Sequence, residues 1–260
     1  MGSYPGLDVS NKVCLVTGGT SGIGRAIALG FAEAGAKVVA GSTNPDKVSA
    51  IKKELGAGHE AVTMNVADEA AVAAAVDFAV KKFGRLDVIV NAAGVIKRQP
   101  SLEMSVEEFR RIVDVNLTGS FLVAQTAARV MKDQTPDARG ERGNIILIAS
   151  LNSYISLVEV LAYAASKSGV LGLVRGLANE WAALGLRVNA IAPGVFPTDL
   201  NRPLIEGTER GKMLKWHTPM GRFGAAEELV GAAIYLASPS ASYTSGHTII
   251  VEGGFLSKGV

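Results

Sequence analysis

Short apolar runs rich in valine and isoleucine alternate along this chain with longer segments whose apolar residues recur every three or four positions. The short runs are typical of buried strands, and the longer segments are typical of amphipathic helices. We predict seven strands, at residues 13–17, 37–40, 61–64, 86–91, 144–149, 187–191 and 248–251. We predict helices at residues 22–34, 46–55, 69–83, 106–131, 163–183 and 226–237.

Strands and helices alternate from the first strand onward, which predicts parallel pairing with right-handed crossovers. The expected fold is a single α/β domain over residues 1–260, a doubly wound (Rossmann-type) seven-stranded parallel sheet with helices on both faces. Residues 193–223 show no clear periodicity, and such a long stretch in a compact domain is typical of a functional loop. We expect part of the substrate site there, and we interpret the polar connection 134–143 as ordinary surface.

Composition narrows the function classes. The 26 basic and 24 acidic residues are scattered and leave a net charge of +2, so neither nucleic acid nor an anionic membrane is indicated as a partner. The single cysteine, Cys14, lies in an apolar run and is expected to be buried, while the three histidines are too far apart in sequence to suggest a metal site. No apolar stretch of about 18 residues and no signal-peptide pattern occurs, so we expect a cytoplasmic protein that acts on a small molecule.

A glycine cluster follows the first predicted strand and leads directly into the first predicted helix: Thr17-Gly18-Gly19-Thr20-Ser21-Gly22-Ile23-Gly24. Glycine lets the backbone turn tightly and approach a pyrophosphate, whose charge is attracted by the free N–H groups at the helix start. An ordinary strand-to-helix turn also uses glycine. The position after the first strand of a parallel sheet nevertheless favours a nucleotide site.

The spacing of these glycines resembles the Thr-Gly-x-x-x-Gly-x-Gly signature of the short-chain dehydrogenase/reductase family. Asn91-Ala92-Ala93-Gly94, after the fourth strand, is similar to the family's Asn-Ala-Ala-Gly segment beside the cofactor. Pro193-Gly194 with Thr198 resembles the segment that contacts the nicotinamide carboxamide. The resemblance extends over nearly the whole chain. It implies an NAD(P)-dependent oxidoreductase that interconverts a secondary alcohol and a ketone by hydride transfer.

The choice between NAD and NADP depends on the end of the second strand, where an acid would bind the ribose hydroxyl and a base would bind a 2′-phosphate. Ser42 and Thr43 are neutral, as is Ser21 in the glycine loop. The sequence therefore favours NADP slightly, only because no carboxylate is present to repel its 2′-phosphate. Asn65-Val66 stands where the family commonly has an aspartate and a valine that bind adenine, and an asparagine carbonyl could accept the same hydrogen bond. The expected cofactor-binding residues are Thr17, Gly18, Ser21, Gly22, Ile23, Gly24, Ser42, Thr43, Asn65, Val66, Asn91, Ala92, Ala93, Gly94, Tyr163, Lys167, Pro193, Gly194 and Thr198.

Tyr163 and Lys167 are four residues apart, so they lie on one face of the predicted helix. A phenol with a pKa of about 10 is a poor base at neutral pH, but a neighbouring ammonium and an oxidised nicotinamide would lower that pKa. The alternative is a tyrosine packed over a lysine stem, and the position of Ser150 at the carboxyl end of the fifth strand argues against it.

The resemblance makes Ser150 the catalytic serine that hydrogen-bonds the substrate oxygen. It makes Asn116 the residue that holds a water linking Lys167 to solvent, although an asparagine in a helical pattern is also explained by a surface position. We therefore predict a catalytic set of Asn116, Ser150, Tyr163 and Lys167.

Residues near the expected active site suggest a substrate. Arg98 and Arg202 could bind a carboxylate and Asn152 could bind a hydroxyl, which suits a sugar acid or polyol. For both arginines a solvated loop position is an equal alternative. The amino-acid sequence of residues 93–98, 148–153 and 198–202 resembles that of the gluconate 5-dehydrogenase and 2-deoxygluconate dehydrogenase branch of the family.

Two other functions stay open. A 3-oxoacyl carrier-protein reductase shares every catalytic motif and would be distinguished by activity on an acetoacetyl thioester. A redox sensor that binds dinucleotide without turnover is the other alternative, although such proteins typically lose the tyrosine that is intact here as Tyr163. The family resemblance also implies a homotetramer.

Overall fold

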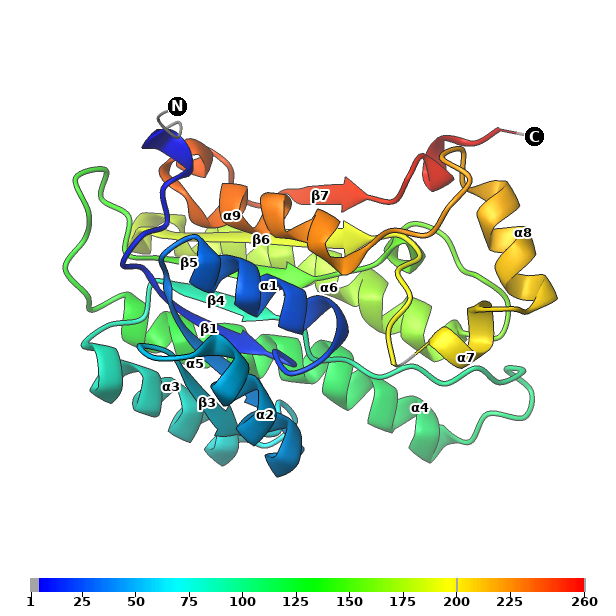
Figure 1. The fold of residues 1–260 in the computed structure, drawn as a ribbon, viewed down its shortest axis with the longest axis horizontal. Coiled ribbons are helices and arrows are strands. Elements are labelled where there is room, and N and C mark those ends of the chain that lie inside the picture. The colour runs from blue at the N-terminus through cyan, green and yellow to red at the C-terminus, as the bar shows by residue number, and fades with distance from the viewer. Residues whose placement is uncertain (1–4, 200, 260) are drawn as a thin grey trace.

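The computed structural model describes residues 5–199 and 201–259, and its centre is one parallel sheet with helices on both faces (Figure 1). The strands run in the order β3-β2-β1-β4-β5-β6-β7. This confirms the predicted fold class. The order in which strands are added to the sheet reverses between β1 and β4, and open parallel sheets bind ligands at such a reversal. The strands are β1 (Val13–Thr17), β2 (Lys37–Ser42), β3 (Glu60–Thr63), β4 (Val88–Asn91), β5 (Gly143–Ile148), β6 (Leu186–Pro193) and β7 (Thr248–Val251).

The helices connect successive strands as right-handed crossovers require. No helix within the described ranges combines the length and the apolar character needed to cross a membrane. The α-helices are α1 (Gly22–Glu33), α2 (Pro45–Leu55), α3 (Glu69–Phe83), α4 (Val106–Val113), α5 (Gly119–Met131), α6 (Leu161–Trp181), α7 (Arg202–Ile205), α8 (Glu209–His217) and α9 (Val230–Ala237). Short 3-10 turns lie at η1 (Pro5–Leu7), η3 (Leu151–Ser153), η4 (Ala182–Leu184), η5 (Ala226–Leu229), η6 (Pro239–Ala241) and η7 (Phe255–Ser257), and η2 (Asp114–Thr118) is a π turn.

Two apolar layers hold the helices to the sheet. Because side chains alternate along a strand, Leu15 of β1 packs in the layer shared with α3, α5 and α6. Its neighbours Cys14 and Val16 pack in the opposite layer with α1, α2 and α9. The expected burial of Cys14 is confirmed, since its side chain is fully inaccessible.

The predicted helix over residues 106–131 is interrupted. The π turn η2 separates α4 from α5 and turns the Asn116 side chain into the protein, where it is fully buried. Its amide oxygen accepts a hydrogen bond from the Val95 N–H at 2.8 Å, and its amide nitrogen donates one to the Val95 carbonyl at 2.9 Å. Apolar periodicity cannot reveal a single extra residue in a turn, so the sequence predicted one continuous helix.

The segment 193–223 is more ordered than expected. It contains α7 and α8, which lie together beyond the carboxyl ends of the strands (Figure 1). These helices escaped prediction because they are short and bury few side chains, with Leu214 the only large one on α8. Thr208 begins α8 by accepting a hydrogen bond from the Gly211 N–H at 3.0 Å.

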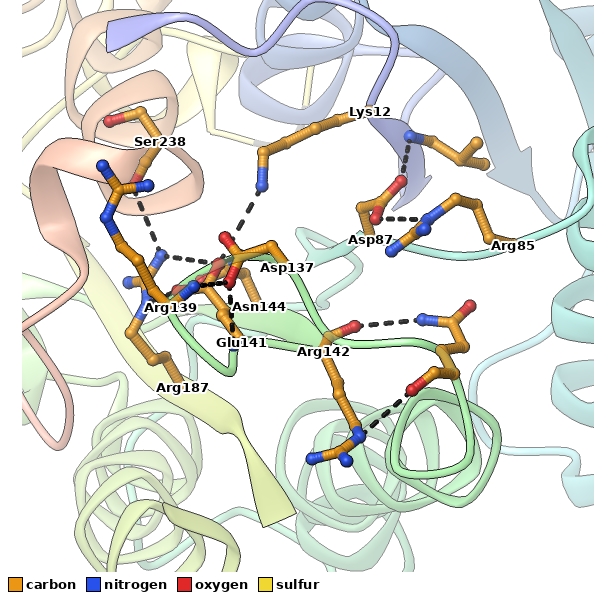
Figure 2. A network of polar contacts seen from close by, with 12 residues as sticks. Lys12, Arg85, Asp87, Asp137, Arg139, Glu141, Arg142, Asn144, Arg187 and Ser238 are labelled. Carbon is orange, nitrogen blue, oxygen red and sulfur yellow. Dashed lines mark hydrogen bonds and ion pairs between the residues drawn. The ribbon is translucent and has the colours of Figure 1, made fainter. Parts of the chain in front are cut away.

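The connection 134–143 is not plain surface, because it belongs to a polar network at the amino ends of the strands (Figure 2). Glu141 accepts a hydrogen bond from Arg187 at 2.6 Å and another from Asn144 at 2.6 Å. The Arg187 side chain is 7 % exposed and also donates to the Thr244 and Ser238 carbonyls. This buried ion pair fixes β5 against β6 at the end of the sheet remote from α7 and α8.

Candidate active site

The turn between β1 and α1 adopts the conformation that a phosphate-binding loop needs. Gly18 has a φ of +64°, and a Cβ there would lie 2.8 Å from the Ala93 backbone nitrogen. Gly22 has a φ of +50°, and a Cβ there would lie 2.9 Å from the Thr198 side chain. Both positions therefore require glycine, and the turn presents the N-terminus of α1 to the space beside it.

A groove of about 390 Å³ runs from this turn to Tyr163. Most of the predicted cofactor-binding residues line it together, which sequence spacing alone could not establish. Lys47, Ile148 and Asp199 also line the groove and were not predicted. The predicted residues in its walls are Gly18, Ser21, Gly22, Ile23, Gly24, Ala92, Ala93, Gly94, Tyr163, Lys167 and Thr198.

The remaining predicted cofactor residues do not line this groove. Ser42 is the last residue of β2 and Thr43 follows it, and exposed Asn65 accepts a hydrogen bond from the Ala67 N–H at 3.0 Å. Gly194 follows β6, is partly buried and lines a second pocket. The others are buried: Thr17, Val66, Asn91 and Pro193.

Lys47 was not predicted as a site residue, because it lies in the first turn of α2, where a lysine is typical of an exposed helix surface. Asn44 caps this helix and accepts hydrogen bonds from the Asp46 and Lys47 N–H groups at 2.9 and 3.0 Å. The Lys47 ammonium lies 3.3 Å from the Asp199 carboxylate. A cation from α2 and an anion from the segment after β6 thus meet at one wall of the groove.

Helix α6 places Tyr163 and Lys167 on one face, as their spacing predicted. The Lys167 Nζ atom is 5.7 Å from the centroid of the Tyr163 ring and donates a hydrogen bond to the Ile148 carbonyl at 2.6 Å. The Lys167 side chain is 4 % exposed, and this burial lowers its pKa to about 8. An ammonium in this position exchanges its proton much closer to neutral pH than a surface lysine does.

We expected Lys167 to lower the pKa of Tyr163, and in the protein chain alone the opposite shift prevails. Burial raises the pKa of the Tyr163 phenol, while a hydrogen bond with the Ser150 hydroxyl lowers it by less. The ammonium of Lys167 is turned toward the Ile148 carbonyl, which explains why its charge does not dominate at the phenol. Favouring the phenolate therefore requires a further positive charge beside Tyr163.

Ser150 follows β5 directly and lies at the carboxyl edge of the sheet. It caps the short turn η3, where its hydroxyl accepts a hydrogen bond from the Asn152 N–H at 3.1 Å. The same turn is bound to α6, because Ser153 donates a hydrogen bond to the Lys167 carbonyl at 2.7 Å. Ser150 and Tyr163 therefore reach one pocket from two elements that are tied together.

A chain of buried hydrogen bonds links β1 to α6. Thr17 donates to the Asn91 side chain, whose amide donates to Ser120 at 2.8 Å. Ser120 donates to the Asn116 carbonyl at 2.6 Å, and the Asn116 amide donates to Ser166 at 3.1 Å. Ser166, on α6, donates in turn to the Tyr163 carbonyl at 2.7 Å.

A second pocket, of about 100 Å³, adjoins the groove at Tyr163 and is covered by α7 and α8. The predicted substrate residues Arg98 and Asn152 line it, and Asn201 and Arg210 join them without having been predicted. The predicted Arg202 is not among the lining residues: its guanidinium is paired with Glu206 at 2.7 Å, and it faces a different hollow. Most other walls of the pocket are apolar: Ile96, Leu151, Leu157, Val160, Val195, Leu204, Ile205 and Leu214.

Within residues 5–199 and 201–259, no three His, Cys, Asp or Glu side chains gather closely enough to hold a metal ion. A nucleotide-sized groove beside a small pocket, with a tyrosine in their common wall, defines a nicotinamide-dependent dehydrogenase or reductase.

Comparison with known proteins identifies the family. The model described as enoyl-(acyl carrier protein) reductase matches residues 18–256. The 2-dehydro-3-deoxy-D-gluconate 5-dehydrogenase of Dickeya dadantii is 38% identical over 96% of this chain and 98% of its own. This chain belongs to the short-chain dehydrogenase/reductase family and is an NAD(P)-dependent dehydrogenase or ketone reductase.

Two further relatives bear on substrate and coenzyme. A gluconate 5-dehydrogenase from Burkholderia cenocepacia J2315, solved in complex with NADP and tartrate, has a TM-score of 0.91 and 36% identity and covers 98% of this chain and 99% of its own. A 3-oxoacyl-(acyl-carrier-protein) reductase of Escherichia coli is 35% identical over 95% of this chain and 98% of its own. These relatives are named as enzymes, so the alternative of a sensor without turnover gains no support from them.

Proposed function

We propose that this protein is an NADP-dependent dehydrogenase that interconverts a secondary alcohol and a ketone on a sugar acid of the gluconate type. The observation that carries the proposal is the position of Tyr163, whose side chain lines both the groove and the smaller pocket. A proton-transfer group at that junction faces the carbon whose hydride is exchanged.

The groove fits a dinucleotide. The close approaches at Gly18 and Gly22 keep the turn free of side chains, and the N-terminus of α1 is suited to a pyrophosphate. The walls that continue to Ala92, Ala93 and Gly94 would hold the nicotinamide half beside Tyr163. An oxidised nicotinamide held there would supply a hydride acceptor and a positive charge near the phenol.

Four side chains of the protein supply the proton chemistry. The Tyr163 phenolic oxygen takes the alcohol proton during oxidation, and the Ser150 hydroxyl hydrogen-bonds the substrate oxygen as charge develops on it. The buried Lys167 passes a proton on, which its lowered pKa of about 8 makes feasible near neutral pH. Asn116, fixed by the π turn, continues the relay toward solvent through a water molecule.

Lys47 supports NADP over NAD. It supplies the positive charge that Ser42 and Thr43 lack, and it lies in the groove at the first turn of α2. Its pairing with Asp199 leaves it half exposed and available to a 2′-phosphate. We expect Lys47→Glu to lower the preference for NADP over NAD, and Lys53→Glu, exposed near the other end of α2, to leave the ratio of the two kcat/KM values unchanged.

Two observations support a sugar acid as substrate. The Dickeya and Burkholderia relatives are named for gluconate-type acids, and the pocket beside Tyr163 contains Arg98 with the amides of Asn152 and Asn201. Guanidinium groups bind carboxylates, and amides bind hydroxyl groups.

The second candidate is a 3-oxoacyl carrier-protein reductase. The apolar side chains of the pocket favour an acyl chain, and the Escherichia coli reductase is a relative over nearly the whole length.

The test is the absorbance of reduced nicotinamide while the purified protein meets gluconate-type acids, neutral polyols and an acetoacetyl thioester, each with NADP(H) and with NAD(H). We expect the highest kcat/KM on a sugar acid with NADP. Turnover confined to the thioester would replace the proposal with the second candidate. Turnover with NAD alone would contradict the coenzyme assignment and leave the substrate assignment intact.

We also propose that the protein is a cytoplasmic homotetramer whose one domain, residues 1–260, holds both pockets, with residues 193–223 forming the substrate loop. The family resemblance suggests the tetramer, and exposed apolar side chains on α4 and α6 support it, among them Val106, Phe109 and Leu161. Sedimentation of a 27.0 kDa species would contradict this assembly.

A further inference from the structure

Arg98 and Arg210 line the smaller pocket, and Glu159 lies next to Arg98 outside its lining. The Arg98 Nε atom forms an ion pair with the Glu159 carboxylate at 2.5 Å. Glu159 occupies the left-handed region with a φ of +68°, and its carbonyl accepts a hydrogen bond from the Gln99 N–H at 2.8 Å. A left-handed glutamate is strained, so the contacts with residues 98 and 99 hold it in place.

Arg210 projects into this cluster from the first turn of α8. Its guanidinium lies 3.5 Å from the Val158 carbonyl, and no carboxylate of residues 5–199 or 201–259 lies within 4.0 Å of it. Desolvation by partial burial lowers the pKa of Arg210, the charge of Arg98 lowers it further, and Glu159 partly offsets both. The cluster therefore carries two positive charges and one negative charge, and the surplus positive charge lies on the side that faces the pocket.

We propose that Arg210 binds the carboxylate of the substrate and that Glu159 sets the charge selectivity by competing with this carboxylate for Arg98. The proposal rests on the sugar-acid function argued above. A guanidinium offers two parallel N–H groups to a carboxylate, and Arg210 has these donors directed at only a weak carbonyl contact. Arg202, by contrast, is already satisfied by Glu206 outside the pocket.

The geometry also orients the substrate. Tyr163 of α6 and Ser150 after β5 line the same pocket as Arg210 of α8. A carboxylate held by Arg210 places the hydroxyl-bearing carbons of the same molecule toward Tyr163. Because Arg210 belongs to α8, substrate binding would also fix this helix over the pocket.

The experiment compares Arg210→Gln, Arg210→Lys and Glu159→Gln with Lys212→Gln as the matched control. Lys212 lies on the same helix, its side chain is 72 % exposed, and among the described residues its ion pair is with Glu209. For each variant, kcat/KM is measured on gluconate and on a neutral polyol. Tartrate binding to the NADP-loaded protein is measured by calorimetry, which does not depend on turnover.

We expect Arg210→Gln to lower kcat/KM on gluconate by about 10- to 100-fold while the value for the polyol changes little, because a charged hydrogen bond is lost only with the acid. For Arg210→Lys, kcat/KM on gluconate should lie between the values of the wild type and of Arg210→Gln. Lysine keeps the positive charge but cannot offer two parallel N–H groups to the carboxylate. Glu159→Gln should tighten tartrate binding by about 3- to 10-fold, because a competing carboxylate is removed. Lys212→Gln should match the wild type.

Equal losses on gluconate and polyol, or an unchanged tartrate affinity in Arg210→Gln, would overturn the assignment of Arg210 while the dehydrogenase function stands. If the wild type oxidises no sugar acid yet binds tartrate through Arg210, the sugar-acid function fails and the anion site stands. If tartrate does not bind the wild type at all, the anion site is refuted.

Discussion

Replacing Lys167 with methionine should change the pH dependence of stability. Lys167 loses its proton at a pKa of about 8 in the folded protein, against an ordinary value of 10.5. Between these values the unfolded chain binds more protons than the folded one, so wild-type stability rises with pH in this window. Methionine carries no proton and removes this contribution.

The magnitude follows from the two pKa values. Keeping Lys167 buried destabilises the folded state by about 3 kcal/mol at pH 7 and by less than about 1 kcal/mol at pH 10. Methionine also leaves the Ile148 carbonyl without its donor, a loss of about 1–3 kcal/mol that is independent of pH. The free energy of unfolding of Lys167→Met minus that of the wild type should therefore fall by about 2–3 kcal/mol from pH 7 to pH 10.

The assay is equilibrium urea unfolding of the coenzyme-free protein at one protein concentration and several pH values. Lys212→Met serves as the control for replacing a lysine that is not buried, because its side chain is 72 % exposed. A difference for Lys167→Met that is constant between pH 7 and pH 10 would refute the reasoning, whatever its absolute size.

Three further substitutions test the catalytic and structural assignments. Tyr163→Phe should lower kcat by about 10²- to 10⁴-fold through loss of the proton-transfer group, while fluorescence titration shows NADPH affinity near the wild-type value. Substantial residual turnover would remove Tyr163 from this role. Ser150→Ala should lower kcat by about 10²- to 10³-fold through loss of a donor to the substrate oxygen, and an equal loss in coenzyme affinity would argue for a structural effect instead. Glu141→Ala leaves the buried Arg187 unpaired and should reduce the free energy of unfolding by about 3–5 kcal/mol in urea. A reduction of under about 1 kcal/mol would show that water or other groups compensate for the missing carboxylate.

Much of the fold could be predicted from the sequence, because buried parallel strands and amphipathic helices leave strong local patterns. The strands β1 and β7 and the helix α3 have the predicted bounds. The helices α7 and α8 could not be predicted, since they bury few side chains and are held by contacts distant in sequence, such as His217 stacking at 4.4 Å on Phe255. The network around Glu141 was missed for the same reason, since its partner Arg187 is 46 residues away.

The candidate site could likewise be predicted only in part from the sequence. Glycine, tyrosine and lysine occur in local spacings that indicate their chemistry, so the wall of the groove near Gly22 and Tyr163 was predicted. Lys47 and Arg210 lie on helices and belong to no recognisable sequence motif. Only the packing of these helices brings the two residues to the pockets. The pKa of Tyr163 was beyond sequence reasoning because burial, not the neighbouring Lys167, determines its direction.

The separation of the two ends of the sheet has a consequence for how this protein tolerates mutation. The pocket proposed to bind the substrate is lined by α7, α8 and the loops at the carboxyl ends of the strands, whereas the Arg187–Glu141 pair lies at the amino ends. Some substitutions that change the pocket will also lower the free energy of unfolding. Stabilising substitutions at the amino ends of the strands can compensate for this loss without altering the pocket, because distant sites contribute independently to stability. A library that varies residues 195–214 on a background stabilised at the amino ends should yield more folded enzymes with new substrates than the same library on the wild type.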